Sequence, residues 1–333
     1  MNRTRVIAVA TLALTVACGS PKSAKPADST APQIAISILP PGEGKFGVDG
    51  GSIWFKVSGA KTGTPVMLLH GGPGFSSFYL KPLEALGDEW PIARYDQLGG
   101  GKSDKLADTT KMNIGHFVDE LEALRSRLGY AKMHLVGHSW GTILALEYYR
   151  KYPNYVASLT FGSAAFDIPQ WERHARALVK TLSDSAQRAV KEADLDRNYQ
   201  AAGYQAALEE FYSLYVWRHP IKADLDSTMA TVSEAIYNYM QGPSEFTITG
   251  TLKKYDATAY LRSIKVPTLF TVGEFDEADP VTIKKQAAMV PGARVEVLPG
   301  AAHITAWDAP EANIKVLRAF LRHADSLTMK MGN

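Results

Sequence analysis

Short apolar runs alternate along the chain with stretches in which apolar residues recur at helical spacing. The runs predict buried strands, and the spaced stretches predict helices that pack against them. Such alternation is typical of an α/β fold in which a mostly parallel sheet is flanked by helices on both faces. The expected strands cover residues 66–69, 91–95, 133–136, 266–272 and 293–298, and helix-like segments occupy residues 142–149 and 281–289.

A long insertion divides this alternating pattern between residues 167 and 256. Its segments carry apolar and aromatic residues at helical spacing, with charged residues between them, so we expect a helical cap. A cap packed over loops at the strand ends would exclude water and limit the size of a substrate. The expected cap helices cover residues 170–193, 204–217 and 224–240, and the stripe of Phe211, Leu214, Tyr215 and Trp217 predicts core packing.

The remaining residues, 34–166 and 257–333, are expected to form the α/β core. Two early segments, residues 34–39 and 52–57, are predicted to begin the sheet as antiparallel edge strands. The length of 333 residues and the hydrophobic content of 46% suffice for one large α/β domain and its cap.

A strained turn is indicated by the pentapeptide Gly137-His138-Ser139-Trp140-Gly141, which lies between a predicted strand and a predicted helix. A chain that presents one side chain at such an apex needs glycine two residues to either side, because larger residues would collide with the neighbouring elements. The hydroxyl of Ser139 is then exposed at the start of a helix, where negative charge is favoured. Ser139 is therefore predicted to be a nucleophile.

A serine nucleophile needs a base, and the base needs a carboxylate that orients it. Asp276 lies in the loop after the apolar run 266–272, and His303 lies in the loop after the run 293–298. Both loops follow the carboxyl ends of predicted strands, where open α/β sheets build their sites. The chain order Ser139, Asp276, His303 is the order expected of an α/β-hydrolase.

An oxyanion hole requires two backbone N–H groups aimed at the developing charge. The residue after the nucleophile, Trp140, supplies the first. The second is expected from the loop His-Gly-Gly-Pro-Gly at residues 70–74, where we choose Gly72 and keep Gly71 as the alternative. The loop at residues 96–104 is also rich in glycine, but its spacing fits no phosphate-binding motif, and we interpret it as a tight structural turn beside the site.

Several of these motifs together resemble the proline iminopeptidases, which are serine aminopeptidases of the α/β-hydrolase fold. The elbow alone is shared by lipases and esterases, so the other motifs make the resemblance specific. It extends from about residue 51 to about residue 321. Four segments carry the general resemblance: residues 70–74, the Asp-Gln pair with the following glycine and serine in 96–103, residues 137–141, and Gly-Glu-Phe-Asp-Glu at 273–277. A fifth segment, residues 241–251, is similar to the tricorn-interacting aminopeptidase branch.

The resemblance implies removal of N-terminal residues, often proline, from short peptides, and hydrolysis of amino-acid amides or arylamides in the broader members. It also implies that Glu245 and Glu277 hold the ammonium group of the substrate, with Tyr237 as a hydrogen-bonding neighbour. A free α-amino group is a cation near neutral pH, and a partly desolvated pocket must offer it negative charge. Without the resemblance, both glutamates would be interpreted as ordinary surface acids.

Two other classes of function stay open on the residues alone. One is an esterase or lactonase on the same scaffold, which relative rates on amino-acid arylamides and simple acyl esters would distinguish. The other is a non-catalytic binding lipoprotein that kept the fold, which does not explain why the candidates for the triad and the oxyanion hole are all present.

The N-terminus resembles a bacterial lipoprotein signal over residues 1–18. Its first five residues are basic in character, an apolar run too short for an ordinary membrane span follows, and Cys18 is the only cysteine of the chain. Lipid on Cys18 would hold the protein at the bacterial cell envelope, facing an exported compartment, with residues 19–33 as a flexible tether. The alternative is a cleaved signal and a soluble secreted or periplasmic protein.

The net charge and the spacing of possible ligands argue against nucleic acid and metal ions as partners. The net charge of +2 leaves no excess of basic residues to bind nucleic acid through counterion release. No group of cysteine and histidine residues has metal-ligand spacing, since His134 and His138 straddle a strand and a turn. We expect no metal and no cofactor, and we expect short peptides or amino-acid amides as partners.

Replacing Cys18 with Ser tests the anchor. The variant should be released from the membrane fraction or misprocessed, because it lacks the thiol that carries the lipid. Labelling with palmitate and the sequence of the mature N-terminus measure this. An unlabelled wild type whose N-terminus lies well beyond Cys18 would replace the lipoprotein assignment with soluble secretion.

Overall fold

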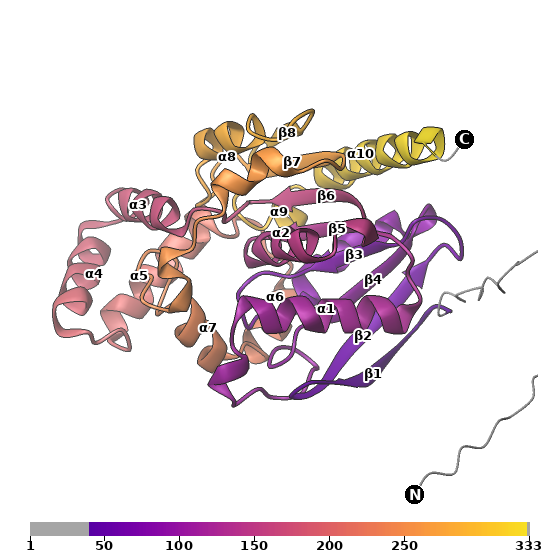
Figure 1. Cartoon of the computed structure of the whole chain (residues 1–333). Helices are drawn as coiled ribbons and strands as arrows, with labels where there is room; N and C mark the ends of the chain where they lie inside the picture. The colour runs from indigo at the N-terminus through magenta and orange to yellow at the C-terminus, as the bar shows by residue number, and fades with distance from the viewer. Residues whose placement is uncertain (1–39, 332–333) are drawn as a thin grey trace, which may run out of the picture. The chain divides into compact units, whose positions relative to one another are not determined.

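The computed structural model describes residues 40–331, which form a central β-sheet flanked by helices (Figure 1). Its eight strands lie in the order β1-β2-β4-β3-β5-β6-β7-β8. The pairs β1–β2 and β2–β4 are antiparallel, and all other neighbours are parallel, so the predicted α/β fold class is confirmed. The strands are β1 Gly42–Val48, β2 Gly51–Gly59, β3 Val66–Leu69, β4 Pro91–Asp96, β5 Met133–His138, β6 Val156–Gly162, β7 Thr268–Gly273 and β8 Arg294–Leu298.

Helices bury the centre of this sheet. Every residue of β3, β4, β5, β6 and β7 is buried, as expected of parallel strands covered on both faces. Helix α2 packs against β5 and β6, α8 against β7, and α10 against β6 and β8. The helices of the core are α1 Ile114–Leu128, α2 Trp140–Lys151, α8 Pro280–Ala287, α9 Thr305–Asp308 and α10 Pro310–Met331, with 3-10 helices η1 Ser77–Asp88, η2 Thr109–Lys111, η3 Pro153–Tyr155 and η5 Thr258–Ser263. The 3-10 helix η4 Thr251–Lys254 lies within residues 167–256.

Residues 167–256 carry the remaining α-helices and enter and leave the core at one place. An isolated antiparallel bridge joins Asp167 to Asp256, so the two ends of the insertion lie together. Figure 1 shows α3, α4, α5 and α7 gathered to one side of the sheet. We propose that this insertion acts as the cap. Its helices are α3 Ile168–Val179, α4 Asp184–Asp196, α5 Ala202–Tyr215, α6 Lys222–Ala230 and α7 Glu234–Met240.

Two helices predicted in the insertion are in fact pairs of helices. The stretch 170–193 is divided between α3 and α4, and the stretch 224–240 is divided between α6 and α7. At each break a serine, Ser183 or Ser233, caps the second helix by accepting a hydrogen bond from the amide three residues later. Serine favours this position because its hydroxyl satisfies a first-turn N–H that has no partner in the helix. The apolar spacing continues across both breaks and hides them.

The first described strand, β1, was not predicted. Its glycines at positions 42, 44 and 47 lower its β-propensity, so no apolar alternation marks it. A hairpin places β1 beside β2. Val48 pairs with Gly51, so Asp49 and Gly50 form the turn. Gly50 has a φ of 97°, which an Asp-Gly hairpin turn requires and which glycine adopts without strain. The predicted strand 52–57 is confirmed within β2 and pairs antiparallel with β4.

The predicted strand 34–39, the signal 1–18 with Cys18, and the tether 19–33 lie outside the described residues. From residue 40 to residue 331, no helix is both long enough and apolar enough to cross a membrane.

Candidate active site

The predicted nucleophile lies at a sharp turn between β5 and α2. Ser139 alone joins the two elements, with a φ of 54° and a ψ of −124°, a conformation that L-residues rarely adopt. A Cβ on Gly137 would lie 2.3 Å from the carbonyl oxygen of Gly141, and a Cβ on Gly141 would lie 2.2 Å from that of Leu69. No side chain fits at either position, and this is why the turn requires glycine at residues 137 and 141.

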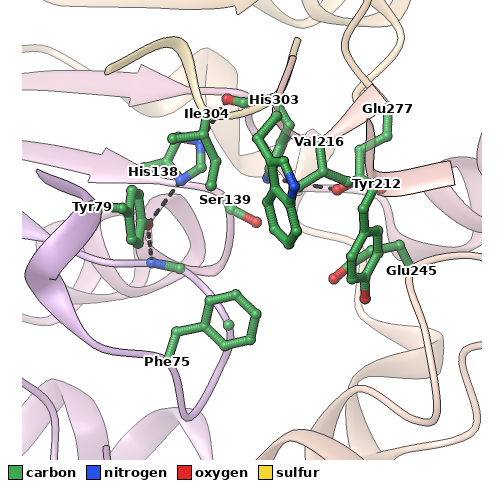
Figure 2. Close-up of a pocket in the computed structure, with 13 residues that line it drawn as sticks. Phe75, Tyr79, His138, Ser139, Tyr212, Val216, Glu245, Glu277, His303 and Ile304 are labelled. Carbon is green, nitrogen blue, oxygen red and sulfur yellow. Dashed lines mark hydrogen bonds and ion pairs between the residues drawn. The ribbon is translucent and has the colours of Figure 1, made fainter. Parts of the chain in front are cut away.

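The loops after β7 and β8 bring Asp276 and His303 into contact. Nδ1 of His303 lies 2.8 Å from Oδ1 of Asp276, and both side chains are buried. Since a carboxylate only accepts, Nδ1 carries the proton and Nε2 is left free to act as a base. His303 and Ser139 line one pocket (Figure 2), and the Ser139 hydroxyl hydrogen-bonds to no other residue in the described part of the chain. The fold thus brings the three predicted residues to one place.

Asp276 is surrounded by donors that keep it ionised. Its Oδ2 accepts hydrogen bonds from the Ser163 hydroxyl at 2.6 Å and the Gly273 amide at 3.1 Å, and its Oδ1 accepts one from the Ala278 amide at 2.8 Å. Burial alone would raise the pKa of Asp276, but the charge of His303 and these hydrogen bonds hold it below its usual value. Ser163 was missed from the sequence, although its place directly after β6 is a signal that could have drawn attention to it.

The two amides predicted for the oxyanion hole are unoccupied by other partners. Neither the Gly72 nor the Trp140 N–H donates to any other residue between 40 and 331. The alternative donor, the Gly71 N–H, is already used, because it donates to Oη of Tyr79 at 2.6 Å. Gly72 has a φ of 114°, which only glycine adopts readily. This geometry favours Gly72 over Gly71.

Gln97 connects the two loops that carry these amides. Its side-chain nitrogen donates to the carbonyl of His70 at 3.1 Å, and its side-chain oxygen accepts from the Trp140 indole at 2.8 Å. Its backbone N–H also donates to Nε2 of His70 at 3.0 Å. The loop at residues 96–104 is therefore a support of the site, a role that glycine spacing alone did not reveal.

The predicted amine-binding residues converge beside the nucleophile. Glu245 and Glu277 line the same pocket as Ser139, and Glu277 is 1% exposed (Figure 2). Glu245 accepts hydrogen bonds from Oη of Tyr237 and, at 3.2 Å, from Nε2 of Gln241. Oε1 of Glu277 lies 3.7 Å from Nε2 of His303, whereas its buried Oε2 has no partner among the described residues.

Both glutamates are harder to ionise than usual. Burial raises the pKa of Glu245. Burial, together with the negative charges of Glu245 and Asp276, raises the pKa of Glu277 well above its ordinary value. Two carboxylates in one partly buried pocket repel each other, and a cation placed between them would stabilise the ionised form of each.

Aromatic and aliphatic side chains form the rest of the pocket. The ring of Phe75 stacks on that of Tyr237, with 5.8 Å between centroids. Of the aromatic stripe predicted as core, Phe211 is fully buried, but Trp217 lines the pocket. Within residues 40–331, no group of three or more His, Cys, Asp or Glu side chains could hold a metal ion. The apolar lining comprises Phe75, Tyr212, Val216, Trp217 and Ile304.

The insertion also supports the loops of the predicted triad. The carbonyl of Tyr215, at the end of α5, accepts hydrogen bonds from the amides of Glu277 at 3.3 Å and His303 at 3.2 Å. The next carbonyl, that of Val216, accepts from the Ile304 amide at 2.7 Å. The insertion therefore fixes the loops of Glu277 and His303 relative to each other.

Comparison with known proteins agrees with this geometry. A family model described as the alpha/beta hydrolase fold matches residues 64–310. A proline iminopeptidase from Heyndrickxia coagulans is 38% identical over 84% of this chain and 98% of its own length. The crystal structure of a proline iminopeptidase from Mycobacterium smegmatis is 29% identical, covers 86% of this chain and 100% of its own, and superposes with a TM-score of 0.79.

A thermophilic esterase from Thermogutta terrifontis is also similar, at 23% identity and a TM-score of 0.62, over 85% of this chain and 99% of its own. At that identity the likeness shows the fold alone.

Ser163→Ala should lower kcat on an amino-acid arylamide roughly tenfold with little change in KM. The variant loses one hydrogen bond to a charged carboxylate, worth about 1.5–3 kcal/mol, part of which is felt in the transition state. Ser158→Ala is the matched control, because Ser158 lies on β6, the strand that Ser163 directly follows, and its hydroxyl contacts Nδ1 of His134 at 2.7 Å rather than a pocket residue. Equal losses of kcat in both variants would contradict a role for Ser163 in orienting Asp276.

Proposed function

Because the chain belongs to the proline iminopeptidase family of α/β-hydrolases, we propose that it releases N-terminal proline, or another small or hydrophobic residue, from short peptides or amino-acid amides through an acyl-enzyme on Ser139. The chain is a serine hydrolase of the prolyl aminopeptidase type. The proposal concerns its substrates, its intermediate and the residues that act.

Acylation begins with the Ser139 hydroxyl. Nε2 of His303 takes the hydroxyl proton as Oγ bonds to the scissile carbonyl carbon, and Asp276 stabilises the imidazolium that forms. The carbonyl oxygen becomes an oxyanion, which the amides of Gly72 and Trp140 stabilise. The carbon–nitrogen bond then breaks, and His303 gives its proton to the departing amine.

Deacylation repeats these steps with water. His303 takes a proton from water as the water oxygen bonds to the acyl carbon, and the second oxyanion occupies the same pair of amides. When the bond to Oγ breaks, the proton returns to Ser139 and the free amino acid leaves.

The observation that carries the proposal is the pair of carboxyl groups, buried Glu277 and half-buried Glu245, in the same pocket as the nucleophile. The unpartnered Oε2 of Glu277 is an acceptor without a donor, which is costly unless a ligand completes it. A substrate ammonium supplies both the donor and the positive charge. An N-terminal amine held there places the first carbonyl of the peptide, and no later one, beside Ser139.

The apolar lining supports a compact first residue. The pocket is walled by Phe75, Tyr212 and Trp217, whose apolar surfaces suit a pyrrolidine ring or a small aliphatic side chain. The rival function, a general esterase, gives the carboxylate pair nothing to bind, because simple acyl groups carry no charge.

We also propose that the enzyme is attached to the bacterial cell envelope through lipid on Cys18. The proposal is supported by the basic start, the short apolar run and the single cysteine of residues 1–18.

The ratio of kcat/KM for proline 4-nitroanilide to that for its N-acetyl analogue tests the substrate class. The wild type should prefer the free amine by roughly a hundredfold or more, since acetylation removes the charge. Glu277→Gln and Glu245→Gln should each lower kcat/KM for the free amine by roughly thirtyfold, equivalent to about 2 kcal/mol, because the cation loses a partner in a desolvated pocket.

Two controls keep this test specific. Glu172→Gln changes a carboxylate of the same insertion that accepts a hydrogen bond from the Ile248 amide and does not line the pocket, so the ratio should stay as in the wild type. Ser139→Ala should abolish turnover of both substrates. A wild-type ratio near one would refute the aminopeptidase proposal while leaving a serine hydrolase.

A further inference from the structure

In the oxyanion loop, residues 70–74, the side chain of His70 holds the peptide group between Gly71 and Gly72. Nδ1 of His70 lies 2.8 Å from the carbonyl oxygen of Gly71 and donates to it. That carbonyl belongs to the same planar unit as the Gly72 N–H, and the two point in opposite directions across a trans peptide bond. Fixing the Gly71 carbonyl therefore fixes the direction of the Gly72 N–H. The imidazole proton is on Nδ1, because Nε2 accepts from the Gln97 amide.

The preceding peptide group is held by Tyr79. Its Oη accepts the Gly71 N–H at 2.6 Å and lies 2.9 Å from Nδ1 of His138 (Figure 2). The loop also packs directly on the nucleophile, since a Cβ on Gly71 would lie 3.0 Å from Cβ of Ser139. A small rotation of this loop would thus move the oxyanion donor relative to the atom that attacks.

His138 continues the chain of hydrogen bonds to the loop of the base. Its Nε2 lies 2.9 Å from the carbonyl oxygen of His303. Because a carbonyl only accepts, Nε2 carries the proton, Nδ1 accepts from the Tyr79 hydroxyl, and that hydroxyl can accept from Gly71. Burial, followed by the charge of His303, lowers the pKa of His138 to about 3, so its ring is neutral throughout catalysis.

These contacts use every polar atom of both side chains. The Tyr79 hydroxyl donates once and accepts once, and both ring nitrogens of His138 are engaged, so neither residue has a group left to bind a substrate. Tyr79 is 1% exposed and His138 is 8% exposed. The network is therefore complete within the protein and needs no ligand.

We propose that Tyr79 and His138 are positioning residues that form a neutral relay, through which the Gly72 amide of the oxyanion hole is held in register with the loop of His303. The relay rests on the proposed function in one respect, that Gly72 donates to the oxyanion. It acts on the transition state more than on the bound substrate, because only the tetrahedral oxyanion needs the amide at its exact position.

Tyr79→Phe tests the relay on a free-amine arylamide and on 4-nitrophenyl acetate. Removal of the hydroxyl should lower kcat roughly tenfold on both substrates and change KM less than about twofold. Tyr130→Phe is the matched control, because the Tyr130 hydroxyl is equally buried and has no partner among the described residues. The acetate has no amine, so a failure of the aminopeptidase proposal would leave this test intact.

Two inhibitors separate positioning from a general loss of structure. Pyrrolidine-2-boronic acid forms a tetrahedral adduct with a serine and mimics the oxyanion, whereas proline mimics the ground state. Tyr79→Phe should weaken inhibition by the boronic acid about as much as it lowers kcat and leave inhibition by proline nearly unchanged. Equal weakening of both inhibitors, or a loss confined to KM, would overturn the relay.

A double-variant cycle tests whether the two residues act as one unit. His138→Gln should lower kcat, and the variant that combines it with Tyr79→Phe should be no slower than the slower single variant, because each change already breaks the same chain. Multiplied losses would mean two independent contributions and would contradict the relay. Thermal unfolding identifies any variant that is not folded, and in that case the inhibitor comparison on the folded single variant decides.

Discussion

The backbone at Ser139 is the constraint on which the rest of the site depends. A φ of 54° and a ψ of −124° cost about 1–3 kcal/mol, and they persist only because α2 is packed so closely on β3 and β5 that Gly141 meets the Leu69 carbonyl. The same packing brings the oxyanion loop against the nucleophile and leaves the Trp140 amide free at the start of a helix. The parallel sheet supplies the other components, since β7 and β8 deliver Asp276 and His303 at their carboxyl ends.

Neutral and charged groups are separated around this turn. The residues that hold the oxyanion loop, Tyr79, His138 and His70, are buried, and burial keeps both imidazoles in their neutral forms. The carboxyl groups of Glu245 and Glu277 lie on the other side of the nucleophile, and no lysine or arginine among the described residues forms an ion pair with either. A buried polar network is rigid when each donor has an acceptor, whereas a buried like-charged pair is unstable until a cation arrives. Rigidity suits a fixed oxyanion hole, and a carboxylate pair that needs a cation suits recognition of an amine.

The sequence predicted the parts that follow from local pattern. Apolar runs located β3, β4, β5, β7 and β8 but not β6, which no expected strand covered. Glycine spacing located Ser139, and the order of strand-end residues located Asp276 and His303. Other parts depend on contacts between distant segments, which no local pattern records. Ser163 meets Asp276 across 113 positions, and Tyr79 meets His138 across 59. The glycine-rich β1 was missed because no apolar alternation marks it, although the Asp-Gly turn after it is a local signal. The serine breaks in the insertion were missed because the apolar spacing continues across both caps.

We propose that a free N-terminal amine directs acyl transfer to Ser139. Mass spectrometry of enzyme quenched in acid during turnover tests this directly, with proline 4-nitrophenyl ester and N-acetylproline 4-nitrophenyl ester compared at equal concentration. One prolyl group should accumulate on the peptide containing Ser139 with the free amine, and the acetylated ester should give little or no adduct. Equal labelling by both esters, or a prolyl group on another residue, would contradict it.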